Sequence, residues 1–285
     1  MLIGKLPLLL TALLFPIFLF SQKDTITNPA YGSAKTLKGR THIINVFVSE
    51  GKKTWAPEYK QQVLDMQNNG LVWLKAQAAK WKMDELNFRR TNIGFEKDIT
   101  LDKIESDKEP STNLHVNWVP LVLHAAGYTS LTDFYDSVKK VNGADNIVVM
   151  IFAAHKGRSY AQPAYNEDKN NFRFLEGAVV YLTDYNNVNM YEGTIIHEML
   201  HLFGAWDMYL SETRTAEVDK KINNLFSQSI MLDSHQAIMN YCTLDPMTAW
   251  LIGWSPKYYP WFEMFRQSNR QYWNAVPGSG FIKLN

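Results

Sequence analysis

Hydrophobic residues along the chain form short continuous runs that predict a β-sheet. Such runs, rich in β-branched and aromatic residues, cover residues 42–49, 145–155 and 177–184. Runs of this kind are typical of strands in a sheet interior, where both faces are buried. Residues 86–95 instead mix apolar and polar positions, which predicts a half-exposed strand.

Longer stretches place apolar residues at helical spacing. The first begins at Pro57, a residue suited to the first turn of a helix, and its pattern continues to residue 83. We expect this helix to be loosened at Asn69 and Gly70. Further helices are predicted over residues 119–128, 131–141, 188–204 and 212–226.

The amino terminus has the pattern of a signal peptide. Lys5 precedes an apolar run over residues 6–20, and we expect cleavage near Ser21. The alternative is a membrane anchor, which needs about 20 apolar residues. This run is shorter and contains Pro16. We therefore expect residues 1–21 to be removed, leaving a secreted or periplasmic protein without stable membrane insertion.

Residues 22–40 are polar and turn-rich, which indicates a flexible lead-in or a short propeptide. The folded domain would then cover residues 41–285. Cys242 is the only cysteine, so no intrachain disulfide can form. The sequence also lacks the Asn-x-Ser/Thr pattern of glycosylation acceptors, which is compatible with bacterial export.

Composition and charge indicate a globular domain without a polyanionic partner. Hydrophobic residues make up 46% of the chain and charged residues 20%, and the formal net charge is +1. Because polyanion binding relies on a marked excess of basic residues, nucleic acid is not an expected partner. The oligomeric state stays open.

The segment HEMLHLFGAWD, residues 197–207, carries the strongest chemical signal. Side chains four positions apart share one face of a helix, so His197 and His201 can direct imidazole nitrogens at one zinc ion. Glu198 is offset from them, beside the water that such an ion would activate. A carboxylate there can act first as general base and then as general acid.

A zinc ion held by two histidines needs a third protein ligand, and Asp207 is the first candidate. Gly204 can adopt the left-handed conformation that ends a helix, so the chain can turn back toward the metal three residues later. Two alternatives remain open. Asp207 could be a hydrogen-bond partner of a ligating histidine or a turn residue, and His235 could be the third ligand in its place.

Read as HExxHxxGxxD, this segment resembles the metzincin zinc metallopeptidases, in the snapalysin-like variant with aspartate as third ligand. The resemblance implies an α+β fold with a twisted mixed sheet, long helices, a zinc-site helix and a small, mainly helical C-terminal subdomain. The upper subdomain would extend to about residue 204, and the lower one would cover residues 205–285. The resemblance also implies an edge strand that pairs with an extended substrate, for which residues 177–184 are the candidate.

Metzincins carry a methionine-containing turn beneath the metal, followed by a tyrosine and a C-terminal helix. The resemblance implies that Met239 forms this turn, with Met231 as its rival. Tyr241 would then contact the transition state, or pack as an ordinary core residue. A helix after Asp245 completes the pattern, whereas the chain beyond Trp254 and the lack of a cysteine-switch propeptide depart from it.

These features favour an exported zinc endopeptidase that hydrolyses peptide or protein substrates with Glu198 as general base. The alternative is a catalytically silent, metzincin-like zinc-binding or scaffold module, which the absence of an obvious propeptide suggests. Hydrolysis of a bond other than a peptide bond is a third hypothesis, because the motif specifies an activated water and leaves the electrophile open.

Overall fold

Six strands form one mixed sheet in the computed structural model, which describes residues 32–101, 118–162, 171–184, 186–209, 215–234 and 241–266. The strands are β1 (Arg40–Glu50), β2 (Asn87–Ile93), β3 (Ile99–Leu101), β4 (Asn146–Lys156), β5 (Tyr160–Gln162) and β6 (Glu176–Thr183). Their order is β2-β1-β4-β6-β5, with β3 also beside β1. Every pairing is parallel except that of β5 with β6. The expected α+β class with a mixed sheet is confirmed.

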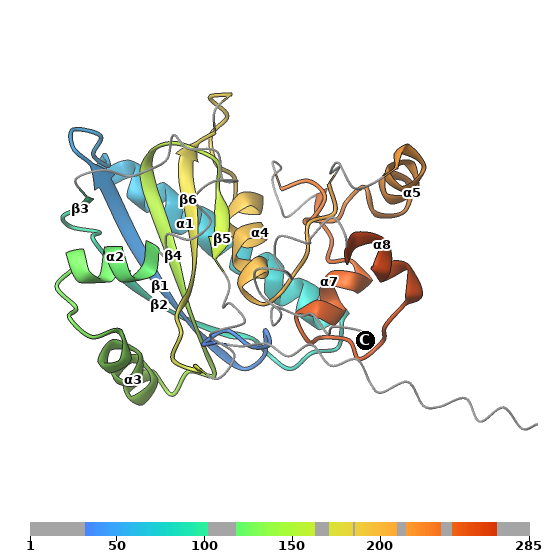
Figure 1. Ribbon diagram of the computed structural model, residues 1–285, viewed down its shortest axis with the longest axis horizontal. Coiled ribbons are helices and arrows are strands. Elements are labelled where there is room, and N and C mark those ends of the chain that lie inside the picture. Colours follow the sequence, from blue (N-terminus) through green and yellow to red (C-terminus); the bar gives the residue numbers. More distant parts are fainter. Residues whose placement is uncertain are drawn as a thin grey trace, which may run out of the picture.

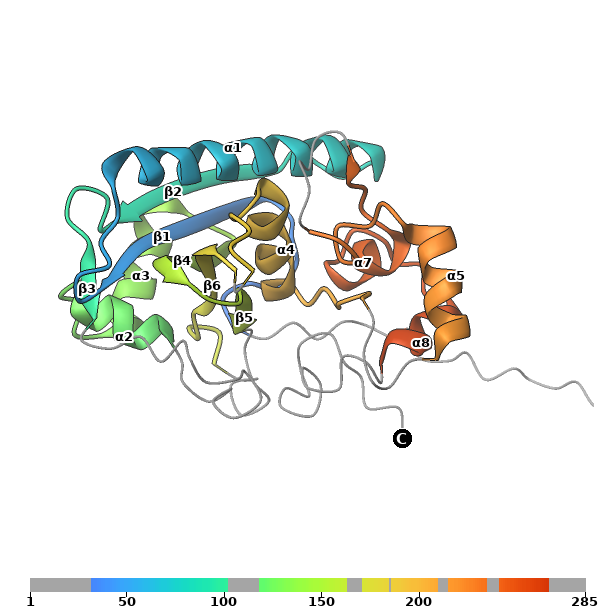
Figure 2. The same ribbon diagram turned by 90° about the horizontal axis from the view of Figure 1, so that it is seen from above.

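Helices cover both faces of this sheet. They are α1 (Pro57–Lys80), α2 (Trp118–Ala125), α3 (Leu131–Asn142), α4 (Glu192–Leu202), α5 (Ala216–Phe226), α7 (Pro246–Leu251) and α8 (Glu263–Arg266), with a 3₁₀ turn η2 (Pro260–Phe262). Figure 2 shows α1 along one face and α2 and α3 along the other. Because side chains alternate along a strand, Phe47 of β1 joins the core beneath α1, whereas Val46 and Val48 join the opposite core.

The helix α4 lies between the sheet and the C-terminal helices α5, α7 and α8 (Figure 1). One hydrophobic cluster joins these parts, with Phe152 from β4, Met199 from α4 and Trp250 from α7. Trp254 and Phe262 are also buried in it. Within the described residues, no helix combines the length and apolar character needed to cross a membrane.

The chain before β1 is packed rather than loose from Gly32 onward. Ser33, Ala34 and Leu37 are buried. The Leu37 amide donates to the carbonyl of Ile252, and the Trp254 indole N–H donates to the Leu37 carbonyl at 2.6 Å. The prediction of a flexible lead-in up to residue 40 is therefore wrong from Gly32 onward, and residues 1–31, with the predicted signal peptide, lie outside the described residues.

The expected edge strand is an interior strand. β6, which covers most of residues 177–184, lies between β4 and β5, so this prediction is wrong. The edge is the three-residue strand β5, which pairs antiparallel to β6. After β6, the Asp184 and Met190 amides donate to the carbonyls of Val188 and Leu182, a reversal that leads directly into α4.

The long helix α1 continues without interruption through Asn69 and Gly70, which corrects the expected loosening. Gly70 is buried where α1 crosses α4, and a β-carbon at this position would lie well inside contact distance of the Ile196 side chain. Glycine thus allows two helix backbones to approach closely, at a cost in helix propensity. Ile196 directly precedes His197, so this contact fixes the helix that carries the histidines.

We predict that Gly70→Ala lowers the free energy of unfolding by about 1–3 kcal/mol, the usual cost of overpacking a core. At an unhindered helix position the same change would be favourable by about 1 kcal/mol. Urea denaturation of the Gly70→Ala variant and the unchanged protein measures whether the free energy of unfolding falls or rises. Because Ile196→Ala removes the obstructing atoms, the double variant should lose less stability than the sum of the two single variants. Additive effects would contradict the close-packing explanation.

Candidate metal centre

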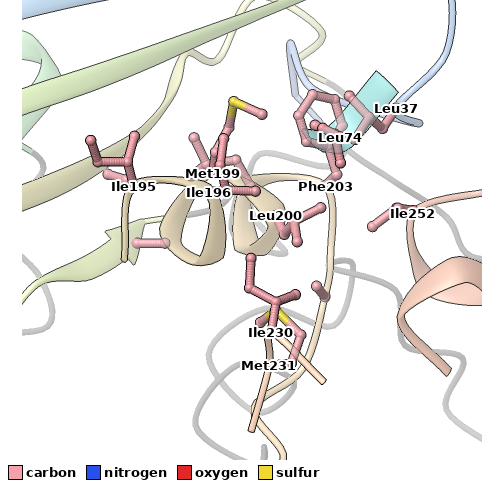
Figure 3. Close-up of a cluster of buried hydrophobic side chains, with 14 of the residues drawn as sticks. Leu37, Leu74, Ile195, Ile196, Met199, Leu200, Phe203, Ile230, Met231 and Ile252 are labelled. Carbon is pink, nitrogen blue, oxygen red and sulfur yellow. The ribbon is translucent and has the colours of Figure 1, made fainter. Parts of the chain in front are cut away.

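The helix α4 presents an apolar face to the core and a histidine pair on another face. Figure 3 shows Ile195, Ile196 and Met199 among the buried hydrophobic side chains, with Ile230 and Met231 on the side of α4 away from Met199. All residues of α4 from Gly193 to Leu202 are buried. Polar groups in such surroundings are unfavourable unless they are paired, so the pair is expected to have specific partners.

His197 and His201 lie one helical turn apart and direct the same ring atom at a common point. Their Nε2 atoms are 3.1 Å apart, and their rings are nearly perpendicular, at 89°. The Nδ1 atoms face backbone carbonyls, that of Ile230 at 3.0 Å and that of Ala205 at 2.8 Å. Because a carbonyl only accepts, each Nδ1 is the donor, which leaves the Nε2 lone pair of a neutral ring directed at the common point.

Asp207 reaches the same point through a turn at Gly204. Gly204 has φ of +92°, and its amide donates to the His201 carbonyl. The Ala205 amide donates to the Leu200 carbonyl, and this pair of bonds is the Schellman end of a helix. The reversed chain places Asp207 Oδ1 at 3.2 Å from His197 Nε2 and 3.1 Å from His201 Nε2.

The three side chains His197, His201 and Asp207 form a buried group that could hold a metal ion. Three electron-pair donors about 3 Å apart repel one another unless a positive charge lies between them. Ligands at 2.0–2.2 Å from a tetrahedral ion are about 3.3–3.6 Å apart, close to the separations of 3.1–3.2 Å found here. The donor set and its spacing therefore fit a metal ion.

The close spacing of these three side chains determines the direction in which the pKa values of Asp207 and His201 are shifted. Burial alone would raise the pKa of Asp207, but the imidazoles of His201 and His197 outweigh it and hold that pKa below its ordinary value. Burial likewise opposes protonation of His201, yet the Asp207 carboxylate raises the pKa of His201 above its ordinary value. Without a metal, protons are thus drawn to the positions where an ion would bind.

Glu198 lies beside this group and does not belong to it. Its side chain is buried and lines a cavity of about 420 Å³ together with His197. Burial raises the pKa of Glu198 to about 7, with the charges of His197 and Arg158 opposing the rise and that of Asp207 adding to it. The other lining residues are Gly157, Arg158, Ser159, Tyr181, Asp184, Asn186, Val188, Asn189, Met190, Thr194, Tyr209, Leu232 and Ser234.

Tyr209 is a member of the site that the sequence analysis missed. Its ring is stacked on that of His197, with centroids 6.2 Å apart and planes 22° apart, and it lines the cavity. Burial raises the pKa of Tyr209 well above its ordinary value, and the neighbouring Asp207 carboxylate, to which its hydroxyl is hydrogen-bonded, raises it further. Its only sequence signal is a position two residues after Asp207.

Tyr241, proposed for this role by resemblance, lies elsewhere. It is 57% exposed and does not line the cavity, so the structure does not bring it to the metal group.

Of the two methionines predicted for the turn, only Met231 lies within the described residues. Met231 is fully buried, its carbonyl accepts from the Met208 amide, and it follows the residue whose carbonyl faces His197 Nδ1. Met239 and His235 lie outside the described residues.

Comparison with known proteins does not assign the chain to a family. No family model matches it, and no curated protein matches it at a significant level. The site must therefore be interpreted from its own geometry.

We predict that Asp207→Ala weakens the binding of a divalent ion by more than about 100-fold, because even the outer partners of metal ligands contribute about 10- to 100-fold. Competition of the purified protein with a chromophoric chelator for zinc measures the change. His124→Ala is the matched control, since His124 is exposed on α2. His235→Ala tests the other candidate ligand: a large loss there, with none for Asp207→Ala, would overturn this assignment.

Proposed function

We propose that this chain is an exported zinc endopeptidase. The observation that carries the proposal is the position of Glu198, a buried carboxylate with a raised pKa, beside the metal-binding group and on the same cavity. A site that only stabilised the fold would need neither the carboxylate nor the cavity. Export to a secreted or periplasmic location rests on the signal-peptide pattern of residues 1–21, and the lack of an Asn-x-Ser/Thr acceptor is compatible with a bacterial protein.

Zinc is the metal that suits the donors best. Catalytic zinc sites use three protein ligands of the histidine and carboxylate types and keep a further position open. His197, His201 and Asp207 supply such a set, and the cavity adjoins it. When bound, a zinc ion supplies a Lewis acid and a water whose pKa is lowered to about 7.

The residues of the chain itself then carry the proton transfers. Glu198 takes a proton from the attacking water and returns it to the amine that leaves, as a general base and then a general acid. Burial favours the protonated form of Glu198 and a nearby cation favours the ionised form, so this carboxylate is placed to take up and release a proton. The Tyr209 hydroxyl lines the same cavity and donates to Asp207; when Asp207 binds a metal ion instead, this hydroxyl can donate to an oxyanion.

A peptide substrate is supported by the sheet edge next to the cavity. β5 is the last strand of the sheet, and the residues directly before it, Arg158 and Ser159, line the cavity. An extended peptide that added to this edge by backbone pairing would run past Glu198. The role that the resemblance gave to residues 177–184 thus passes to β5, Tyr160–Gln162.

A catalytically silent zinc-binding module is the alternative. Purely structural zinc sites close the fourth position with a further protein ligand. Among the described residues the metal-binding group consists of three side chains and adjoins an open cavity, which favours catalysis. Hydrolysis of another kind of bond is the weaker alternative, because the β5 edge offers backbone pairing specific to an extended peptide.

We predict that Glu198→Gln retains zinc and loses peptidase activity by about 100- to 10,000-fold, the range attributed to a general base. Glutamine has nearly the same shape and cannot take up a proton. The measurement is cleavage of a broad peptide library by the zinc-loaded proteins, with metal content checked on the same samples. Unchanged cleavage by the variant would refute the role of Glu198, and no cleavage by either protein would favour the silent module.

We also predict that Tyr209→Phe lowers kcat about 100- to 1,000-fold with a small change in KM, as for the loss of one oxyanion donor. Phenylalanine keeps the ring that is stacked on His197 and removes only the hydroxyl. Tyr241→Phe is the matched control, because that exposed side chain does not line the cavity. If the Tyr241 variant loses activity and the Tyr209 variant does not, the assignment by resemblance is correct and ours is not.

A further inference from the structure

A buried carboxylate outside the metal group binds the start of the described chain, and one of its two oxygens has no hydrogen-bond partner among the described residues. Glu176, the first residue of β6, is 1% exposed. Its Oε2 accepts from the Ser33 amide at 2.8 Å, from the Ser33 hydroxyl and from the Ala34 amide at 3.0 Å. Its Oε1 is buried and has no hydrogen-bond partner in the described part of the chain. None of the basic side chains described there forms an ion pair with it.

The single amide proton of Ser33 is shared between two acceptors. The Ser33 nitrogen lies 2.8 Å from Glu176 Oε2 and 2.9 Å from the Phe174 carbonyl oxygen, although an amide carries one proton. The Ser33 hydroxyl is shared in the same way between Glu176 Oε2 and the Ile147 carbonyl. A buried carboxyl in this setting either keeps its proton, as burial favours, or is ionised next to a charged donor.

We propose that Ser33 is the first residue of the mature protein and that its free α-ammonium forms a buried ion pair with Glu176. An ammonium has three protons and a positive charge. It can serve Glu176 Oε2 and the Phe174 carbonyl together, and a third proton is left for Glu176 Oε1. The charge compensates the carboxylate that burial otherwise penalises.

The required step is hydrolysis of the bond between Gly32 and Ser33. One water adds across this peptide bond: its oxygen joins the Gly32 carbonyl carbon, the C–N bond breaks, and the Ser33 nitrogen leaves as an amine that takes up a proton. The residues ahead of the bond fit a processing peptidase that acts beyond the apolar run and selects small residues one and three positions before the cut. Those positions hold Gly32 and Ala30.

The order of events also follows from burial. Gly32 and Ser33 are both buried, so a peptidase cannot reach the bond once this segment has packed between β4 and β6. Cleavage therefore precedes packing of the segment. The predicted boundary near Ser21 would then mark the end of the apolar run rather than the mature terminus.

The uncut and cut chains should differ in how their stability depends on pH. In the uncut chain, burial raises the pKa of Glu176 from 4.5 to about 8. The folded state then holds a proton that the unfolded state has released, so this contribution to stability is complete below about pH 4.5 and is lost as the pH rises to about 8. In the cut chain the ammonium keeps Glu176 ionised, and this loss disappears.

The test compares chains that start at Ser33 or at Gln22, each with Glu176 or with Glu176→Gln. We expect the Ser33 chain to unfold at a temperature at least about 2 °C higher at about pH 8. The difference should shrink toward pH 6 and vanish in the Glu176→Gln pair. The proposal is overturned if the Ser33 chain has no higher unfolding temperature than the Gln22 chain, or if the difference persists in the two Glu176→Gln chains. If the Glu176→Gln chains do not fold, acetylation of Ser33 replaces them, because it removes the charge and should abolish the gain.

The exported protein itself supplies a second measurement. Intact mass and amino-terminal sequencing of protein recovered after export should identify Ser33 as the first residue. A mature chain that begins at Gln22, or at any other residue, overturns the proposal. Both measurements concern folding and processing, so their outcome is independent of whether the metal group supports peptidase activity.

Discussion

The convergence of three electron-pair donors on one buried point is the constraint on which the rest of the site depends. His197 Nε2, His201 Nε2 and Asp207 Oδ1 lie 3.1–3.2 Å from one another. Nothing in hydrophobic packing favours this arrangement, and mutual repulsion opposes it. The arrangement is maintained because the Nδ1 atom of each ring donates to a backbone carbonyl, which fixes the direction of Nε2. The turn at Gly204 fixes the position of Asp207.

The surrounding fold serves to hold α4 in one position. The close contact between Gly70 of α1 and Ile196 fixes α4 against α1. The Ile230 carbonyl, in the segment that also contains Met231, accepts from the His197 ring of α4. Since the ring-supporting carbonyl comes from the C-terminal half and α4 packs on the sheet, the geometry of the metal group depends on both halves being docked. Met231, buried next to Ile230, fills this junction without demanding one side-chain shape.

The main elements and the residues of the candidate metal group could be predicted from the sequence because their signals are local. Continuous apolar runs specify β1, β4 and β6, and the spacing of His197 and His201 is a property of one helix. Features that depend on contacts between distant parts of the chain were predicted wrongly or missed. Gly70 looked like a helix breaker because its partner Ile196 is distant in sequence, and the three residues of β5 are too few to form a pattern. Tyr209 has no periodic or motif signal, so only the turn at Gly204 brings it to the site.

The amino-terminal segment extends this dependence to maturation of the chain. Its first part pairs with Glu176 at the start of β6, and a few residues later Leu37 exchanges hydrogen bonds with Ile252 and Trp254, just beyond α7. The segment therefore ties the sheet to the same C-terminal half that supports the His197 ring. If the ion pair at Ser33 forms only after cleavage, then the uncut chain docks these halves less firmly. Processing and metal binding would in that case be linked through the fold, without any direct contact between Glu176 and the metal group.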